Sequence, residues 1–206
     1  MPRRNPFEDR PVRSRRGGPV KEPLSRDAIV AEALRQITTQ GLEGTSLRKV
    51  AAALHTGPAS LYAYVEDLSE LHALVLDRAL AKVSLRQAPG TGARVRLHRV
   101  LSSYAWVLNA SPGLAQLAFG TIAVGPNALR ITEKLLVLLE EAGVSAATAA
   151  WAVDLLVLFV TASVAERGRV ARAELLSGTG EERFRWALDV LLEGLLHSSD
   201  SRVVHR

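Results

Sequence analysis

Cysteine is absent from this chain of 206 residues, so the protein has no disulfide framework and no metal site built on thiolates. Aromatic residues are also scarce, at 5% of the chain, whereas 48% of the residues are hydrophobic, mostly leucine and alanine. This composition favours helices over β-sheets. The first 23 residues lack the apolar run of a signal peptide, and we therefore expect a cytoplasmic protein.

Motifs of catalysis are missing as well. The chain has no glycine-rich phosphate loop, and its histidines are scattered without the spacing of metal ligands. They are His55, His72, His98, His197 and His205. We therefore predict no catalytic residue, no metal site and no cofactor, in a protein that is not an enzyme.

One long hydrophobic run, residues 146–165, approaches the length of a transmembrane helix. Its single charged residue, Asp154, lies near the middle, where hydrocarbon would penalise a carboxylate. No second run of this kind accompanies it. We therefore predict a helix buried in a core or in an oligomer interface, and no association with a membrane.

The excess of positive charge lies almost wholly at the N-terminus. Residues 1–23 contain seven basic and three acidic residues, and thus carry four of the five net positive charges of the chain. Five prolines and no apolar periodicity predict that this basic tail is disordered. We hypothesise that Arg13, Arg15 and Arg16 lie along a DNA backbone or enter a minor groove. The alternative is a leader without a role.

Two short helical patterns surround a four-residue break within residues 45–64. The first pattern places apolar residues at i, i+3, i+4 and i+7, namely Leu47, Val50, Ala51 and Leu54. Thr45 or Ser46 can cap its start. Pro58 opens the second helix, which we expect to run through Leu61 to Val65. The pattern is typical of a helix-turn-helix and predicts DNA binding, with an ordinary helical hairpin as the alternative.

Helical periodicity also describes the rest of the chain. Ser25 is expected to cap a first helix that ends at Gln40 before Gly41. The further helices are expected at residues 68–86, 93–109, 114–124, 127–141, 145–166 and 181–197. We therefore predict an all-α fold, in which residues 24–70 form a three-helix DNA-binding domain and residues 71–206 form a larger helical domain for ligand binding and dimerisation.

The motifs of residues 25–74 resemble those of the TetR family of one-component transcriptional repressors. The matching pieces are the capped first helix, TSLRKVA at residues 45–51 and SLYAYV at residues 60–65. This resemblance implies a repressor that binds a near-palindromic, double-stranded DNA operator as a homodimer and responds to a small apolar or amphipathic ligand. It also implies release of DNA through a swing of the helix at residues 68–86. The alternative is a helical module that binds another protein and no specific DNA.

The resemblance further implies which residues contact DNA. By position they are Ser46, Arg48, Gly57, Pro58, Ala59, Ser60, Tyr62 and Tyr64. The two tyrosines would hold phosphates, the alternative being that one ring, such as that of Tyr62, packs against the first helix. Arg48 would contact DNA or pair with Glu43 or Glu66.

Two departures from the family pattern bear on affinity. His55 stands where glycine is usual in the turn, and Glu66, Asp67 and Leu68 stand where many members have a cation. Residues 24–70 contain four basic and six acidic residues, a net charge of −2. Because phosphate neutralisation supplies much of DNA affinity, we expect this domain alone to bind weakly.

Polar and aromatic residues within apolar helices mark a candidate ligand pocket. They are Tyr104, Trp106, Asn109, Gln116, Phe119, Thr121, Trp151, Asp154 and Phe159. Each of them has an ordinary core position as its alternative. Asp154 stands out, because a carboxylate on a nearly uncharged helix needs a cation, a hydroxyl or a partner across a dimer.

The segments at residues 145–166 and 181–197 are too apolar for an exposed surface. We predict that they pair across a twofold axis in a four-helix bundle. The residues expected at this interface are Val153, Leu156, Val157, Val160, Leu188, Leu191, Leu192 and Leu195. The alternative is that these helices form the core of their own domain.

Overall fold

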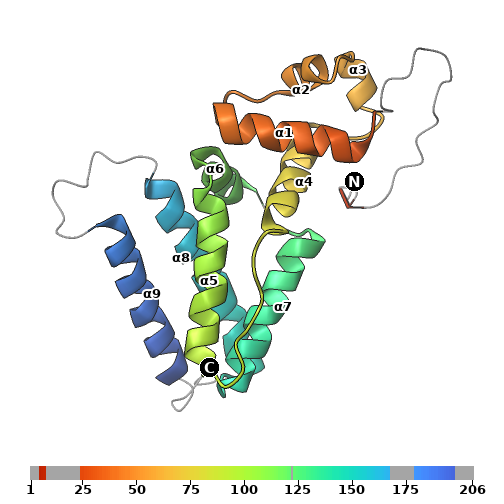
Figure 1. The fold of residues 1–206 in the computed structure, drawn as a ribbon. Coiled ribbons are helices and arrows are strands. Elements are labelled where there is room, and N and C mark those ends of the chain that lie inside the picture. The colour runs from red at the N-terminus through yellow and green to blue at the C-terminus, as the bar shows by residue number, and fades with distance from the viewer. Residues whose placement is uncertain (1–4, 8–23, 122, 168–178, 198–206) are drawn as a thin grey trace, which may run out of the picture.

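The computed structural model describes residues 5–7, 24–121, 123–167 and 179–197, and within these ranges every regular element is a helix. Three helices, α1 (Arg26–Gln40), α2 (Leu47–Ala53) and α3 (Pro58–Leu61), lie together at one end of the molecule (Figure 1). Helix α4 (Leu68–Leu80) leads from them to a larger bundle. The predicted all-α fold is confirmed.

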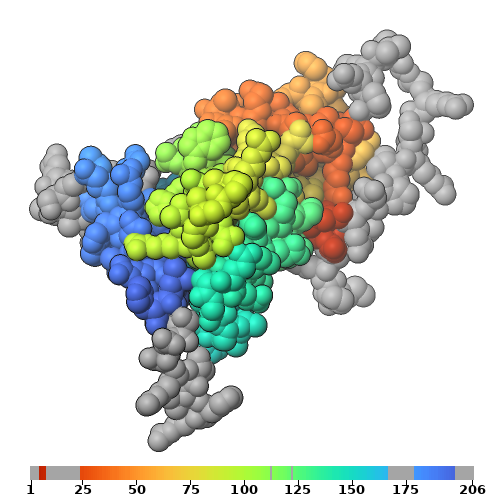
Figure 2. All heavy atoms as spheres, turned by 60° about the horizontal axis from the view of Figure 1, so that its bottom comes forward, coloured from red at the N-terminus to blue at the C-terminus, as the bar shows by residue number. Residues whose placement is uncertain are grey.

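The larger bundle contains the remaining helices. They are α5 (Ala93–Asn109), α6 (Pro112–Gly120), α7 (Pro126–Glu141), α8 (Ala146–Arg167) and α9 (Gly180–His197). Helix α8 packs against α5, α6, α7 and α9. It is long and apolar enough to cross a membrane by length and composition, yet its contacts are those of a core helix in a bundle. In the space-filling view, the α4–α5 connection and α5 (yellow to yellow-green) lie between α9 (blue) and α7 (green) (Figure 2).

Local side-chain caps define the ends of α1 and the start of α2. The hydroxyl of Ser25 accepts a hydrogen bond of 3.1 Å from the N–H of Ala28, and that of Ser46 accepts one of 3.3 Å from Lys49. Gly41 follows α1 with a φ of 79°, a left-handed conformation in which glycine carries no steric penalty. Of the two candidate caps for α2, the structure therefore selects Ser46.

Two helices are shorter than their sequence patterns predict. Helix α3 ends at Leu61 and not at Val65, because the N–H groups of Tyr64 and Val65 both bond the carbonyl oxygen of Leu61 and close the helix there. Helix α4 ends at Leu80 and not at residue 86. There the chain turns, as the N–H of Val83 bonds the Leu80 carbonyl oxygen.

The three-helix part of the molecule contacts the larger bundle directly through α1 and α6. The hydroxyl of Ser111, which caps α6, donates a hydrogen bond of 3.3 Å to the carbonyl oxygen of Ile37 in α1. Gly113 allows this approach, since a Cβ at that position would lie 2.7 Å from the same oxygen. Helix α6 therefore supports α1 from below (Figure 1).

Candidate DNA-binding surface and ligand cavity

A small apolar core holds α2 and α3 against α1. Val50, Ala51, Leu61 and Val65 have no exposed surface, and they belong to the same buried cluster as Ile29 of α1. The burial of one face of each helix leaves the opposite face on the surface. This arrangement gives a helix-turn-helix in which the outer face is available for another molecule.

The turn between α2 and α3 is built around His55. This residue has a φ of 52°, the only positive value among the described residues other than glycine. Histidine enters the left-handed region more readily than most non-glycine residues, which explains why it can replace glycine here. The position where glycine is usual in the turn thus holds a left-handed histidine.

Most residues predicted to contact DNA lie on the outer face. The exposed ones are Arg48, Gly57, Pro58, Ala59, Ser60 and Tyr62. The side chain of Tyr62 is 54% exposed. Ser46 is half-buried, and its hydroxyl already caps α2. Together with the exposed Lys49 of α2, these residues form one surface along α2 and α3, which we call the outer face.

Tyr64 has a different position from Tyr62. Its hydroxyl donates a hydrogen bond of 2.6 Å to the carbonyl oxygen of Leu24, just before α1. The sequence left open that one of the two tyrosines turns inward, and it pointed to Tyr62. The structure shows that the tyrosine turned inward is Tyr64. Since the hydroxyl of Tyr64 is engaged within the protein, its role as a phosphate anchor is not supported.

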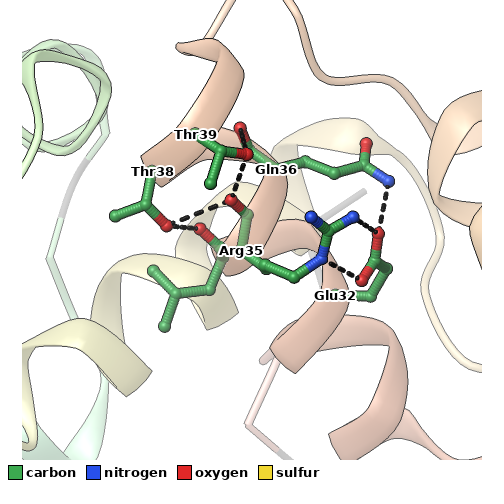
Figure 3. Close-up of polar contacts among 6 residues, drawn as sticks. Glu32, Arg35, Gln36, Thr38 and Thr39 are labelled. Atoms are coloured by element: carbon green, nitrogen blue, oxygen red, sulfur yellow. Dashed lines mark hydrogen bonds and ion pairs between the residues drawn. The ribbon is translucent and has the colours of Figure 1, made fainter.

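Two of the four basic residues in this domain are neutralised by carboxylates. Arg26 Nη2 lies 2.7 Å from Glu70 Oε1, and Arg35 forms two bonds of 2.7 and 2.8 Å to Glu32. Figure 3 shows the second pair on α1, where Gln36 adds a bond of 2.8 Å to the same carboxylate. The hydrogen bond from Arg35 lowers the pKa of Glu32, although partial burial opposes it. The pair is therefore stably ionised.

The remaining two basic residues lie next to each other at the start of α2. Arg48 is exposed and takes part in none of the described ion pairs, so neither Glu43 nor Glu66 is its partner. Lys49 is exposed and donates a bond of 2.6 Å to the carbonyl oxygen of Gly44. The outer face thus offers two cations to phosphates.

The start of α4 carries a reciprocal side-chain cap. Asp67 accepts a bond of 2.7 Å from the N–H of Glu70, and the Glu70 carboxylate accepts from the N–H of Glu66. This cap occupies two of the N–H groups near the start of the helix and adds negative charge, which disfavours an anion there. Arg13, Arg15 and Arg16 lie outside the described residues.

A cavity of about 390 Å³ lies within the larger bundle. Its lining residues come from α4 to α8, and the notable ones are Leu80, Tyr104, Phe119, Ala128, Asp154 and Thr161. The hydroxyls of Tyr104 and Thr161 lie 2.9 Å apart and join α5 to α8 in its wall. Burial raises the pKa of Tyr104, so this phenol is neutral at physiological pH.

The lining contains part of the predicted pocket. Tyr104, Phe119, Thr121 and Asp154 are present, and Asp154 is the one charged side chain among the described residues that line it. Five other predicted positions do not line the cavity, namely Trp106, Asn109, Gln116, Trp151 and Phe159. Trp106 is 68% and Trp151 65% exposed, and Asn109 is also exposed. Phe159 stacks on Phe184 of α9 at 5.8 Å between centroids.

Sequence reasoning missed the remaining lining residues because they are ordinary apolar or small side chains. Leu80, Ala118, Ala123, Ala128, Ile131, Thr132, Leu158 and Thr161 belong to this group. Val153 and Val157 were expected at a dimer interface and line the cavity. No feature of composition separates such positions from the rest of an apolar helix.

The predicted dimer interface needs a correction. Five of its eight residues face the core of their own protomer, with 3% exposure or less: Val153, Leu156, Val160, Leu188 and Leu192. The opposite face of α8 and α9 is apolar and exposed. Its residues are Trp151, Leu155, Leu158, Trp186 and Val190, which we call the outer stripe. When nearly every side of a helix is apolar, its sequence does not show which face is buried and which is exposed.

Comparisons with known proteins match two separate parts of the chain. Residues 29–64 match a family model described as bacterial regulatory proteins, tetR family. Residues 88–175 match a model described as tetracyclin repressor-like, C-terminal domain. The first match covers most of α1 together with α2 and α3, and the second covers α5 to α8.

A curated relative is the HTH-type transcriptional repressor DrrR1 of Streptomyces coeruleorubidus, 31% identical over 179 residues and 86% of this chain. The match spans 66% of that relative's length, and 56% of the length of an HTH-type transcriptional regulator of Saccharopolyspora erythraea. This chain therefore spans less than two thirds of the length of these two curated relatives.

Solved structures share the fold over nearly all of their length. Apo ActR from Streptomyces coelicolor has a TM-score of 0.82 and 28% identity, covering 88% of this chain and 99% of that one. The putative transcription regulator SCO7704 of Streptomyces is 38% identical, with a TM-score of 0.70 over 90% of this chain and all of that one. ActR in complex with actinorhodin gives a TM-score of 0.79 at 28% identity, over 87% of this chain and 100% of that one.

Proposed function

Because the chain belongs to the TetR family of transcriptional regulators, we propose that it is a repressor that binds a near-palindromic operator as a homodimer and responds to a small molecule. The observation that carries this proposal is the outer face, where the exposed side chains of α2 and α3 lie on a buried apolar core. Such a face fits into the major groove and presents side chains to base edges. As a regulator, the protein acts in the cytoplasm and needs no catalytic residue.

DNA affinity comes from few cations within each protomer. Arg48 and Lys49 are the basic residues of the outer face, and the nearby start of α4 is acidic. Phosphate contacts dominate DNA affinity and its salt dependence. The operator is therefore held by two helix-turn-helix units together, with the arginines of the N-terminal tail as the supplement.

The homodimer forms through the outer stripe of α8 and α9. Trp151 and Trp186 are 65% and 69% exposed, which is unusual for the largest apolar side chains of a protein surface. A second copy that presents the same stripe buries both tryptophans in a four-helix arrangement. We expect the twofold axis to leave the two DNA-binding domains on the same side of the dimer, as two half-sites of one operator require.

The ligand of the cavity is a neutral or positively charged amphipathic molecule. Apolar side chains dominate the lining, the hydroxyls of Thr121 and Thr132 offer hydrogen bonds, and Asp154 contributes a negative charge. No basic side chain is among the described residues that line the cavity, so an anionic ligand has no counter-charge there. ActR was solved with actinorhodin, which supports a cavity of this kind as a site for an organic ligand.

The test is selection of an operator from random duplex DNA by the full-length protein, followed by titration at several salt concentrations. Enrichment of a near-palindromic sequence is expected. Deleting residues 1–20 should flatten the dependence of log K on log salt, since each lost phosphate contact lowers the slope by about 0.9. An Arg48→Gln variant should lower the slope in the same way. Failure to enrich any sequence contradicts the proposed function, and an unchanged slope after deletion contradicts the role of the tail.

A further inference from the structure

A buried carboxylate of α4 caps the start of α7. Asp77 is 8% exposed and accepts hydrogen bonds from the N–H of Asn127 at 2.8 Å, its side-chain amide at 2.8 Å, and the N–H of Ala128 at 3.2 Å. The N-cap residue of α7 is Gly125, which has no side chain to do this. The first turn of α7 therefore depends on a residue from another helix.

The reverse contact runs from α7 to the end of α4. Arg130 Nη2 donates to the carbonyl oxygens of Leu80, Ala81 and Val83, at 3.4, 3.5 and 3.3 Å. The Leu80 carbonyl also accepts from the N–H of Val83, so Arg130 adds a second donor there, and a cation is favoured near the end of a helix. Each helix thus supplies the cap of the other, an arrangement we call the α4–α7 latch.

The latch lies between the cavity and the DNA-binding domain. Leu80 of α4 and Ala128 of α7 line the cavity, each within three residues of a latch residue. On its other side α4 is tied to α1 by two ion pairs, Arg26 with Glu70 at 2.7 Å and Arg78 with Asp27. A displacement of α7 by a molecule in the cavity therefore reaches α1 through α4.

The junction has little room for adjustment. A Cβ at residue 125 would overlap the Asp77 carboxylate and lie 2.6 Å from the ring of Phe7. Phe7 lines a groove beside α1 and α4 together with Asp77 and Asn127, and Arg26 donates to the carbonyl oxygen of Pro6. The N-terminal segment thus covers one side of the latch. Tight packing of this kind transmits a shift and does not absorb it.

We propose that Asp77 and Arg130 are positioning residues that couple occupancy of the cavity to the orientation of the DNA-binding domain. This proposal rests on the proposed function and adds to it the element by which the two sites communicate. Loss of either cap frees α4 from α7. The orientation of the DNA-binding domain then no longer depends on whether the cavity is occupied. By reciprocity, operator binding then no longer alters the cavity.

The experiment uses the full-length protein with spin labels at Gln40→Cys in α1 and Glu133→Cys in α7, both exposed positions in a chain without cysteine. Dilution with unlabelled protein isolates the distance within one chain. Asp77→Asn and Arg130→Gln should broaden this distance distribution in the free protein. The matched control for Asp77 is Asp189→Asn, which removes a carboxylate paired with Arg94 between α9 and α5 but leaves the latch and the α1–α4 ion pairs intact. Arg185→Gln, in an exposed pair of α9, is the control for Arg130.

A second measurement separates coupling from simple stabilisation. In the wild-type protein, binding of the selected operator should change amide exchange at residues 127–132 by about fivefold or more, the lower range of ordinary coupling. In either latch variant the change should fall below about twofold, whereas Arg130→Lys, which can still donate to the carbonyls, should retain it. If Asp77→Asn does not fold, Arg130→Gln still provides the test. The three hydrogen bonds of Arg130 are longer than those of Asp77 and less buried, so their loss should disturb folding less.

The outcomes distinguish the two proposals. Unchanged distance distributions in both latch variants overturn the latch, as does a wild-type operator response that persists in them. If no operator can be selected, the proposed function fails, and the distance measurement in the free protein still decides whether the latch orients the DNA-binding domain.

Discussion

The hydroxyl of Tyr64 donates a hydrogen bond of 2.6 Å to the carbonyl oxygen of Leu24, which joins the end of the helix-turn-helix to the start of α1. Tyr62, two residues earlier, lies on the outer face with 54% of its side chain exposed. Two tyrosines that are equivalent in the sequence motif therefore have separate tasks. Tyr64 holds the domain together, and Tyr62 is placed to meet a phosphate.

We predict that Tyr64→Phe lowers the free energy of unfolding by about 1 kcal/mol, because a half-buried carbonyl loses its partner. Tyr62→Phe should change it by less than about 0.5 kcal/mol, as is usual at exposed positions. Urea denaturation measures both, and operator titration should show the larger loss of affinity for Tyr62→Phe. A larger stability loss for Tyr62→Phe than for Tyr64→Phe would contradict this division of tasks.

The left-handed backbone of His55 leads to a second prediction. His55→Gly and His55→Ala both remove the imidazole, so comparing them isolates the cost of the backbone conformation. At a φ of 52°, the Ala variant should be less stable than the Gly variant by about 1 kcal/mol, the usual penalty for a Cβ in this region. Equal stability, measured by urea denaturation, would mean that the turn rearranges in the variants.

A third prediction concerns His72 of α4. Burial lowers the pKa of this histidine below its ordinary 6.5, although Asp67 opposes the shift, and its Nε2 is buried without a hydrogen-bond partner. As the pH falls through 6.5, the unfolded chain takes up the proton before the folded one does, so stability decreases. The wild type should therefore lose more stability between pH 7.5 and 5.5 than His72→Gln. The carboxylate of Glu32, with its pKa below 4.5, titrates outside this window.

That comparison is made by thermal or urea unfolding at both pH values. The remaining histidines are common to both proteins, so the difference between the two losses reports His72 alone. Equal losses in the two proteins would show that protonation of His72 carries no cost.

The helix boundaries that local sequence signals define were predictable. Ser25 and Gly41 delimit α1, and Gly143 follows α7, because capping and left-handed glycine are properties of a few neighbouring residues. The contact of Arg130 with the end of α4 was not predictable, since it joins residues 50 apart in the sequence. Asp77 gave no signal for the same reason.

The faces of the apolar helices could not be assigned either. Helix α8 carries a single charge, Asp154, within residues 146–165, so little in the sequence separates Val153 from Leu155, yet one is 3% and the other 44% exposed. The DNA-binding surface was easier to predict from the sequence, because exposed small and polar residues such as Ser60 alternate with buried Leu61 on a short helix. Sites made by distant helices require the packing to be known.

The outer stripe gives the last prediction. Val190 of α9 and Val137 of α7 are the same residue type with 49% and 45% exposure, but only Val190 lies on the stripe. If the dimer forms there, Val190→Lys places a charge in a buried interface and should dissociate the dimer, whereas Val137→Lys should leave it intact. Sedimentation or light scattering over a range of concentrations measures the dissociation constant, with circular dichroism to establish that both variants fold. Dissociation by Val137→Lys with an intact Val190→Lys dimer would contradict this prediction and place the interface on α7.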